Sequence, residues 1–590
     1  MGLMQRAYET YETLSSKFVG VYDETQKEVF APISHTVTKA DIEITLDLEG
    51  NFHSARAIDK DEGKIIIPVT ENSSGRTSKP YAHPLCEQLG YLCGKDEEKF
   101  CLYIDQLSKW EKEAKLPSLR AVLQYVKGKT IWDDLSQADL IKLDEKGKLK
   151  NEKSLIKWKI LGCDEPDCTK DHALMDSFIQ FYKSSTNENP YDLCMLNGQF
   201  AQSASQHPKG IVAINGNAKL ISSNDSSGFT FRGRFADEHQ AISVSYEASQ
   251  KAHNALRWVI ANQGVLFGSR MFICWNPHGI KLPSVKSAFL SNTEPIILYS
   301  DYKSILQKTL NGWKTNLPND AMAVIAAFDA ATTGRLAVTY YNELLASDFL
   351  ERLYFWDESC CWMNGSFGIQ SPALYNIVNY AFGDRRDESR IEPDDRILRQ
   401  QMQHLIACRI EKAPIPTDIE RALVVRCGNL HLYEKALRSK MLFTTCAVVR
   451  KYRMEQKKEV WELALEPHKK DRSYQYGRLL AVMEKIERDT YDSDEKREPN
   501  AMRLQSVFVQ RPQNATAIIM EQLKKAYYPQ LRPGTRIFYD RLIGEIMNEI
   551  SECMGNWNAA LEDTYLMGYY LQKRELYQAK EKEQKEEETK

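Results

Sequence analysis

The residues best suited to chemistry lie between Leu193 and Trp275, where cationic, hydroxyl and amide side chains alternate with glycine. From His207 to Phe235 there is a single acid, Asp225, against four cations: Lys209, Lys219, Arg232 and Arg234. Small polar residues stand among them: Ser223, Asn224, Ser226, Ser227 and Gly228. Because small residues expose backbone N–H groups and let a polyanion approach closely, this composition favours contact with phosphate.

A β-hairpin and a helix should position this stretch. The apolar run Ile211–Ile214 precedes Asn215-Gly216, the strongest short signal for a hairpin turn. We expect Lys219–Ile221 to be the returning strand and Tyr246–Ile260 to be a helix.

A second polar loop is expected at Asn72–Pro80, after three strands at 42–48, 52–58 and 64–69. It contains no acid, and its possible phosphate-contacting residues are Asn72, Ser73, Ser74, Gly75, Arg76, Thr77, Ser78 and Lys79. Two interpretations stay open from composition alone. The loop is a solvated turn, or its cations and hydroxyls contact phosphate or a groove edge.

Helical periodicity dominates the sequence beyond residue 398, where at least four amphipathic segments predict an antiparallel bundle. Ser473 is the expected N-cap of one of them, and Gly477 would let a neighbouring helix approach closely. Four cations, Lys524, Lys525, Arg532 and Arg536, gather around Tyr527-Tyr528-Pro529. Basic residues beside aromatic ones suit a single nucleic-acid strand, and the alternative is a solvated helix end.

Composition narrows the class of protein. A chain of 590 residues with 43% hydrophobic and 27% charged residues should hold several globular domains. Its net charge of −3 means that any polyanion must be bound by local patches. Thirteen scattered cysteines predict reduced thiols in a cytoplasmic protein, and no apolar run is long enough to span a bilayer.

Motifs for catalysis and metal binding are sparse. We find no phosphate-binding Walker loop, no nucleophile elbow and no zinc-protease motif, so a binding role is favoured over an enzyme. Cys163 and Cys168, near Asp164, Asp167 and His172, are the only metal-ligand types in close spacing. Without a second close pair they favour ordinary thiols, so no metal or other cofactor is predicted.

The predicted fold class is α+β, with an N-terminal mixed region containing antiparallel hairpins and a C-terminal all-α bundle. We expect an N-terminal domain at 1–190 and a central α/β domain at 191–383. A charged linker at 384–397 and a helical bundle at 398–590 should follow.

Several motifs occur in an order that resembles a known family. They are Gly216 in the hairpin, Ser222-x-Asn224, Ser227-Gly228 followed by Gly233, Ser245-x-Glu247-Ala248, Asn254-Ala255-Leu256 and Trp275. Two more stand near the end, Tyr474–Glu484 and Gly568-Tyr569-Tyr570. Together they resemble the large subunit of the type I-C CRISPR surveillance complex, Cascade. The Leu-Gly element at Leu89-Gly90 also matches, whereas Leu85-Cys86-Glu87 replaces the usual Asp-Asn dipeptide.

The resemblance implies a non-catalytic subunit that reads the protospacer-adjacent motif beside the target, stabilises the R-loop and recruits a separate helicase–nuclease. Its implied partners are target double-stranded DNA, guide RNA, the backbone and guide-end-capping subunits, and a small subunit related to the C-terminal bundle. We therefore assign the Asn72–Lys79 loop to the flanking motif and the four C-terminal cations to the displaced strand. DNA near the motif is assigned to Lys209, Ser223, Asn224, Ser226, Ser227, Gly228, Arg232 and Arg234.

Two other classes of function remain. One is a nuclease or nucleotide-processing enzyme with an unrecognised site around His207, His239 and His253. The other is a scaffold without nucleic-acid contact.

Overall fold

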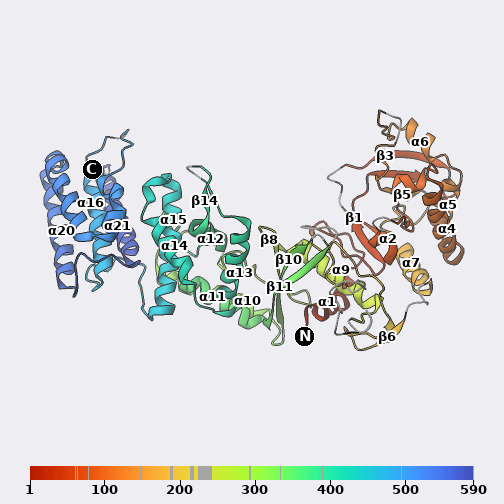
Figure 1. Cartoon of the computed structure of the whole chain (residues 1–590), viewed down its shortest axis with the longest axis horizontal. Helices are drawn as coiled ribbons and strands as arrows, with labels where there is room; N and C mark the ends of the chain where they lie inside the picture. The colour runs from red at the N-terminus through yellow and green to blue at the C-terminus, as the bar shows by residue number, and fades with distance from the viewer. Residues whose placement is uncertain are drawn as a thin grey trace. The chain divides into compact units, whose positions relative to one another are not determined.

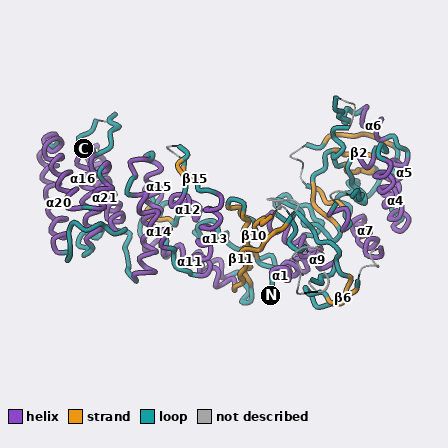
Figure 2. Tube along the Cα trace, in the orientation of Figure 1, coloured by secondary structure: helices purple, strands orange, loops and turns teal. Residues whose placement is uncertain are grey.

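The computed structural model describes residues 1–588 except 60–61, 63, 77–78, 146–148, 186–189, 213–217, 223–234, 236–241, 291–293, 333, 388–389 and 493. The chain forms two compact units. Unit 1 comprises residues 1–282 and 321–344, and unit 2 comprises residues 283–320 and 345–590. Figure 1 follows the chain by colour, and Figure 2 shows that helices dominate the C-terminal half.

The first half of unit 1 is built on a three-stranded sheet. Strand β2 (Ile42–Leu46) lies in the middle, antiparallel to β3 (Phe52–Ala57) and parallel to β5 (Ile156–Ile160). One apolar core joins this sheet to the surrounding helices. These are α3 (Leu89–Leu92), α4 (Glu97–Ala114), α5 (Pro117–Lys127), α6 (Ile131–Gln137) and α7 (His172–Ser185).

The second half of unit 1 packs two helices against a four-stranded sheet. Helices α1 (Leu3–Phe18) and α9 (Tyr246–Gln263) share a core with the strands. Ser245 caps α9, since its side chain accepts a hydrogen bond from the N–H of Ala248. The strand order is β11 (Arg335–Leu345), β10 (Met322–Thr332), β9 (Arg270–Trp275) and β8 (Val265–Phe267).

Unit 1 also contains two short antiparallel strand pairs. Strand β1 (His35–Thr38) pairs with β4 (Ile65–Pro68), and β6 (Tyr191–Leu193) pairs with β7 (Phe200–Gln202). Directly after β4, the single-turn helix α2 (Glu71–Gly75) begins the polar loop that the sequence singled out.

The first part of unit 2 is a group of helices with short hairpins between them. Its helices are α10 (Tyr299–Thr315), α11 (Ala346–Ser359), α12 (Leu374–Phe382), α13 (Asp395–Glu411), α14 (Thr417–Cys427) and α15 (Lys435–Tyr452). The hairpins are β12 (Trp362–Met363) with β13 (Ile369–Gln370), and β14 (Asp384–Arg385) with β15 (Ile391–Glu392). Short 3-10 turns lie at η1 (Gly365–Phe367) and η2 (Leu430–Leu432), and the π-helical turn η3 (Arg453–Lys457) extends α15.

The C-terminal part of unit 2 surrounds α16 (Arg472–Arg488), which is buried from Ser473 to Glu487. Around it lie α17 (Asn500–Arg503), α18 (Gln505–Gln510), α19 (Pro512–Gln522), η4 (Leu523–Tyr527), η5 (Tyr528–Gln530), α20 (Pro533–Glu552) and α21 (Thr564–Glu588). Helices α16 and α21 cross at two glycines. A Cβ on Gly477 would lie 1.9 Å from the Tyr565 oxygen, and one on Gly568 would lie 2.0 Å from the Tyr474 oxygen. Close approach at Gly477, predicted from the sequence, is confirmed.

The α+β class is confirmed, as are the β2–β3 hairpin, the helix that the sequence predicts from about Leu3 to Lys17, and the helix predicted at Tyr246–Ile260. Some local expectations were wrong. Residues 72–75 are helical because Thr70 forms a capping box with Ser73. Asp471, not Ser473, caps α16, since its side chain accepts from the N–H of Tyr474. The sequence also predicts a helix over Asn342–Phe355, and in the structure this helix begins at Ala346 because β11 continues to Leu345.

The chain crosses between the units at residues 282/283, 320/321 and 344/345. The charged segment 384–397 lies in unit 2, where it includes the β14–β15 hairpin and the start of α13.

All thirteen cysteines are free thiols. Among the helices that the structure describes, none has both the length and the apolar content needed to cross a bilayer.

Candidate nucleic-acid interface

Glu71 ties the polar loop after β4 to a distant part of unit 1. Its buried carboxylate accepts hydrogen bonds from Ser205 N (3.0 Å), Ser205 Oγ (2.9 Å) and Gln206 N (3.2 Å). The N–H of Glu71 donates to the Tyr182 hydroxyl at 3.0 Å. The first turn of α2 therefore has a fixed position beside the stretch that begins the second predicted phosphate site.

Arg76 stabilises the fold of the loop. Its guanidinium forms a two-point ion pair with Glu87, which is fully buried, at 2.5 and 2.8 Å, and donates to the Tyr81 carbonyl at 2.6 Å. The same group lies 4.8 Å from the centre of the Tyr91 ring. Burial opposes the charge, but Glu87 outweighs it and raises the pKa of Arg76. Because its donors are used inside the protein, Arg76 has a structural task that the sequence did not indicate.

Lys209, Lys219 and Arg335 stand side by side on three neighbouring chain segments. Lys209 pairs with Lys219 in an antiparallel bridge, and Lys219 pairs with Arg335 in a parallel one. Two hydrogen bonds hold the second pairing, from Lys219 N to Gly334 O (3.1 Å) and from Leu336 N to Lys219 O (3.0 Å). Since paired residues project from the same face of a sheet, the three cationic side chains share one face.

This cationic group lies beside the α2 loop. Lys209 Nζ donates to the carbonyl of Arg76 at 3.3 Å. Burial, and then the charge of Arg76, lowers the pKa of Lys209. Burial, and then Lys209, also lowers the pKa of Lys219, although Glu71 opposes the shift. In the described part of the chain neither lysine has a carboxylate within ion-pair distance. A bound anion would therefore stabilise the positive charge of both lysines.

Buried polar residues pack behind the face that carries Lys209, Lys219 and Arg335. Arg257 of α9 donates to the Lys209 carbonyl (2.9 Å) and to Thr36 Oγ1 (2.8 Å). The Oγ of Ser249 lies 2.8 and 3.3 Å from the Nδ1 atoms of His207 and His253, whose rings are stacked. Burial lowers the pKa of His207 to about 3 and that of His253 to about 4, so both rings are neutral near pH 7.

The structure thus brings together parts of two predicted sites. Asn72 and Lys79 are exposed, Ser74 and Gly75 are half-buried, and Ser73 is buried, with its Oγ 3.0 Å from His83 Nδ1. Thr77 and Ser78 lie outside the described residues, as do Ser223, Asn224, Ser226, Ser227, Gly228, Arg232, Arg234 and His239. Lys219, counted from the sequence among the phosphate-favouring cations, and Arg335 were not among the residues assigned to DNA, although their positions beside polar turns were a usable signal.

The third predicted site is a cationic end of the C-terminal bundle. Lys524, Lys525, Arg532 and Arg536 are all exposed near η4, η5 and the start of α20. Lys525 pairs with Glu521 at 2.6 Å, and Arg536 donates to the Tyr528 carbonyl at 3.1 Å. The expectation that neighbouring tyrosines offer stacking surfaces was wrong, because Tyr527 and Tyr528 are buried.

In the Cys163–Cys168 region, the carboxylate of Asp167 stabilises the fold through hydrogen bonds. Asp167 accepts from Lys157 at 2.8 Å and from Thr169 Oγ1 at 2.7 Å, while Cys168 is buried. Within the described ranges, no group of three or more histidine, cysteine or carboxylate residues is arranged to hold a metal ion.

The sequence matches the family described as CRISPR-associated protein (Cas_Csd1) over residues 8–577, and the chain therefore belongs to this family. Membership in this family confirms the resemblance of the chain to the large subunit of Cascade. No curated protein matches the sequence significantly.

Proposed function

We propose that the chain is the non-catalytic large subunit of a type I-C Cascade and that unit 1 reads the protospacer-adjacent motif. The guide RNA would read the target by base pairing, while the protein binds a short flanking duplex. R-loop formation is nearly balanced in free energy, so modest protein contacts are enough to favour it. Unit 2 would hold the displaced strand, and a separate helicase–nuclease would cut.

The observation that carries this proposal is the cationic group Lys209, Lys219 and Arg335 beside the α2 loop. Two half-buried lysines with lowered pKa values and no acidic ion-pair partner in the described chain leave positive charge uncompensated. A phosphate diester would supply the missing negative charge. The exposed Asn72 and Lys79 lie on the adjoining loop, where polar side chains suit base edges or the backbone.

The test compares Lys209→Ala plus Lys219→Ala with wild type in the assembled, guide-loaded complex. We expect weaker binding to target duplexes, with a salt slope lower by about 0.9 for each phosphate contact removed. Lys127→Ala, an exposed lysine on α5, is the matched control. Unchanged affinity and salt slope in the double variant would favour a scaffold without nucleic-acid contact.

The absence of catalysis is a separate part of the proposal. The rival site around His207 and His253 can be tested by incubating the purified chain with labelled DNA and divalent metal ions. We expect no cleavage. Metal-dependent cleavage that is lost in His253→Ala would replace the binding role with a nuclease.

The small subunit is proposed to correspond to the C-terminal bundle made from an internal start. Met483 lies inside α16, so a start there would remove residues 472–482, more than half of the 17 residues of the central helix. A start at or upstream of Met454 keeps α16 whole, and a start upstream of Arg453 also keeps its ion pairs with Glu562 and Asp563. Intact-mass measurement of small polypeptides that co-purify with the complex tests this, and a product beginning at Met483 would contradict it.

A further inference from the structure

A second cationic site lies in unit 2, in a cavity of about 510 Å³. Four stretches of chain form its walls. They are the η1 turn, the segment from η2 into α15, the end of α16 with α17, and the middle of α21. A volume of this size is within the usual range for small-molecule sites.

The charges that line the cavity are mostly positive. Five cations, Arg438, Lys440, Arg488, Lys573 and Arg574, face a single acid, Glu484. Glu484 is buried and accepts from Arg488 Nε (2.6 Å), Lys573 Nζ (3.0 Å) and Tyr569 Oη (2.5 Å). Although burial opposes its charge, Lys573 and Arg488 lower the pKa of Glu484 to about 2. Glu484 is therefore ionised, and its carboxylate oxygens already accept hydrogen bonds from Arg488, Lys573 and Tyr569.

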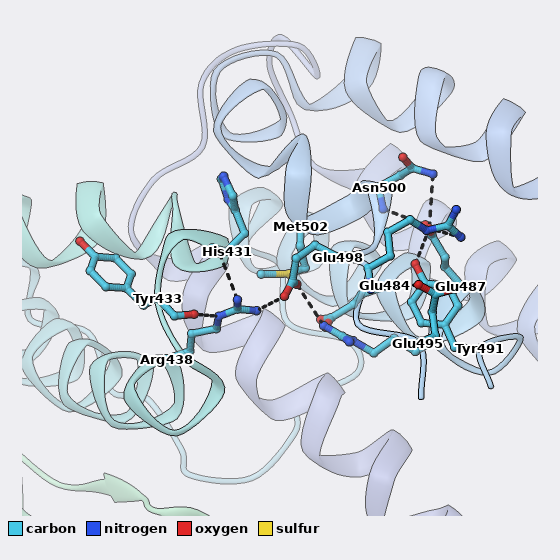
Figure 3. A network of polar contacts seen from close by, with 12 residues as sticks. His431, Tyr433, Arg438, Glu484, Glu487, Tyr491, Glu495, Glu498, Asn500 and Met502 are labelled. Atoms are coloured by element: carbon cyan, nitrogen blue, oxygen red, sulfur yellow. Dashed lines mark hydrogen bonds and ion pairs between the residues drawn. The ribbon is translucent and has the colours of Figure 1, made fainter. Parts of the chain in front are cut away.

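Arg438 lines the same cavity, and polar contacts fix its guanidinium (Figure 3). Its guanidinium donates to the carbonyl of His431 at 3.0 Å and pairs with Glu498 at 2.8 Å. Lys440 and Arg574 have no ion pair within the described residues. After Glu484 and Glu498 are counted, three positive charges remain around the cavity.

Aromatic side chains also line the cavity. Phe367 is 67% exposed and Tyr577 is 39% exposed. A tight turn presents Phe367, since Asn364 N donates to Gly368 O at 2.8 Å and Gly365 N donates to Tyr570 Oη at 3.3 Å. Tyr570 in turn donates to the carbonyl of Met363 at 2.5 Å. The fold thus holds a large apolar ring in solvent at a cationic cavity.

From this combination we propose that the cavity binds a nucleotide, with its planar base against Phe367 or Tyr577 and its phosphate near Lys440 and Arg574. Aromatic rings stack on any base, and cations neutralise the phosphate without selecting a sequence. The nucleotide is a unit of a single DNA strand or a free mononucleotide. The strand version rests on the proposed function, because the displaced strand is its source.

The experiment uses the purified full-length chain and fluorescently labelled oligothymidylate. Phe367→Ala should weaken binding about 5- to 150-fold, the factor that corresponds to one stacked base. Lys440→Ala plus Arg574→Ala should weaken it and lower its salt slope. Controls are Phe538→Ala, another exposed aromatic residue in unit 2, and Lys435→Ala, an exposed lysine outside the cavity lining.

Two further probes identify what the cavity takes. An abasic oligomer should bind with the same lysine and arginine dependence and be insensitive to Phe367→Ala. Thymidine monophosphate that binds with Phe367 dependence, when oligothymidylate does not, would identify a free nucleotide as the ligand. If neither thymidine probe responds to Phe367→Ala or to the double variant, the nucleotide site is refuted. Duplex binding that still depends on Lys209 and Lys219 would leave the proposed function of unit 1 intact.

Discussion

Adding one methyl group at Gly477 should force two helices of the C-terminal bundle apart. In Gly477→Ala the new Cβ would lie 1.9 Å from the Tyr565 oxygen, 2.7 Å from the Tyr565 carbonyl carbon and 2.9 Å from Tyr569 N. All three are backbone atoms of α21, which no side-chain rotation can move away. The carbonyl oxygen must therefore retreat by about 1.5 Å before the contact becomes an ordinary one.

The free-energy cost of this overpacking is partly offset by the higher helix propensity of alanine. Overpacking a closely packed interior costs ~1–3 kcal/mol, and the upper end applies because the backbone itself must shift. Alanine in place of a helical glycine returns ~1 kcal/mol. We expect a net loss of ~2 kcal/mol, which corresponds to a fall in the unfolding temperature of roughly 4–8 °C for a unit of this size.

Differential scanning calorimetry measures this shift, and Gly544→Ala is the matched control. Gly544 lies inside α20 with no atom within 4 Å of an added Cβ, so that substitution should be neutral or slightly stabilising. Gly568→Ala contacts Tyr474 at the same crossing. Since one separation of the helices relieves both contacts, the double variant should lose less than the sum of the singles. If Gly477→Ala behaves like Gly544→Ala, the close crossing of α16 and α21 is wrong.

Three further predictions concern charge and pH. Arg76→Ala should cost ~3–5 kcal/mol in urea unfolding because it leaves Glu87 buried and unpaired, whereas Lys79→Ala should stay within ~0.5 kcal/mol; equal effects would contradict the ion pair. Burial lowers the pKa of four histidines of unit 1, to about 3 for His207 and about 4 for His35, His83 and His253. As the pH falls, the unfolded chain binds protons at these histidines before the folded chain does. Unit 1 should therefore be fully stable above pH 6.5 and lose stability as the pH falls from 6.5 toward 4, and the loss should be smaller in His83→Asn. Burial and the neighbouring Asp563 raise the pKa of Glu420 in unit 2 to about 7. Its contribution should therefore decrease as the pH rises from about 4.5 to about 7, and Glu420→Gln should stabilise the protein at pH 8 but not at pH 4.

Local patterns in the sequence predicted the elements that local forces determine. Alternation of apolar residues located β2 and β3, and the sequence also located α9 and α16. Gly477 was predicted to allow a close approach, and Gly568, part of the same resemblance, is its counterpart at the crossing with α21. In each case the signal lies within a few residues of its effect.

Long-range pairing could not be predicted in the same way. Nothing in the composition of the polar loop indicates that Arg76 would form an ion pair with Glu87. Nor does it indicate that Glu71 would accept hydrogen bonds from Ser205, 134 residues away. Burial of Tyr527 and Tyr528 depends on helices that close over them, so residue type alone suggested a stacking surface that these two rings do not offer. The structure therefore gives individual residues of the candidate site roles that the sequence did not predict.

The alternation of the two units along the chain affects how the protein can be made. Residues 283–320 leave the ribosome before 321–344, yet they belong with helices that are synthesised later still. Strands β8 and β9 must likewise wait for β10, which is separated from β9 by the whole of α10. Folding during translation, domain by domain from the N-terminus, is the usual order for large proteins. Here neither unit can be completed before residue 344 has emerged, and a nascent chain stalled before β10 exposes the edge of β9 and an α10 without its helical neighbours.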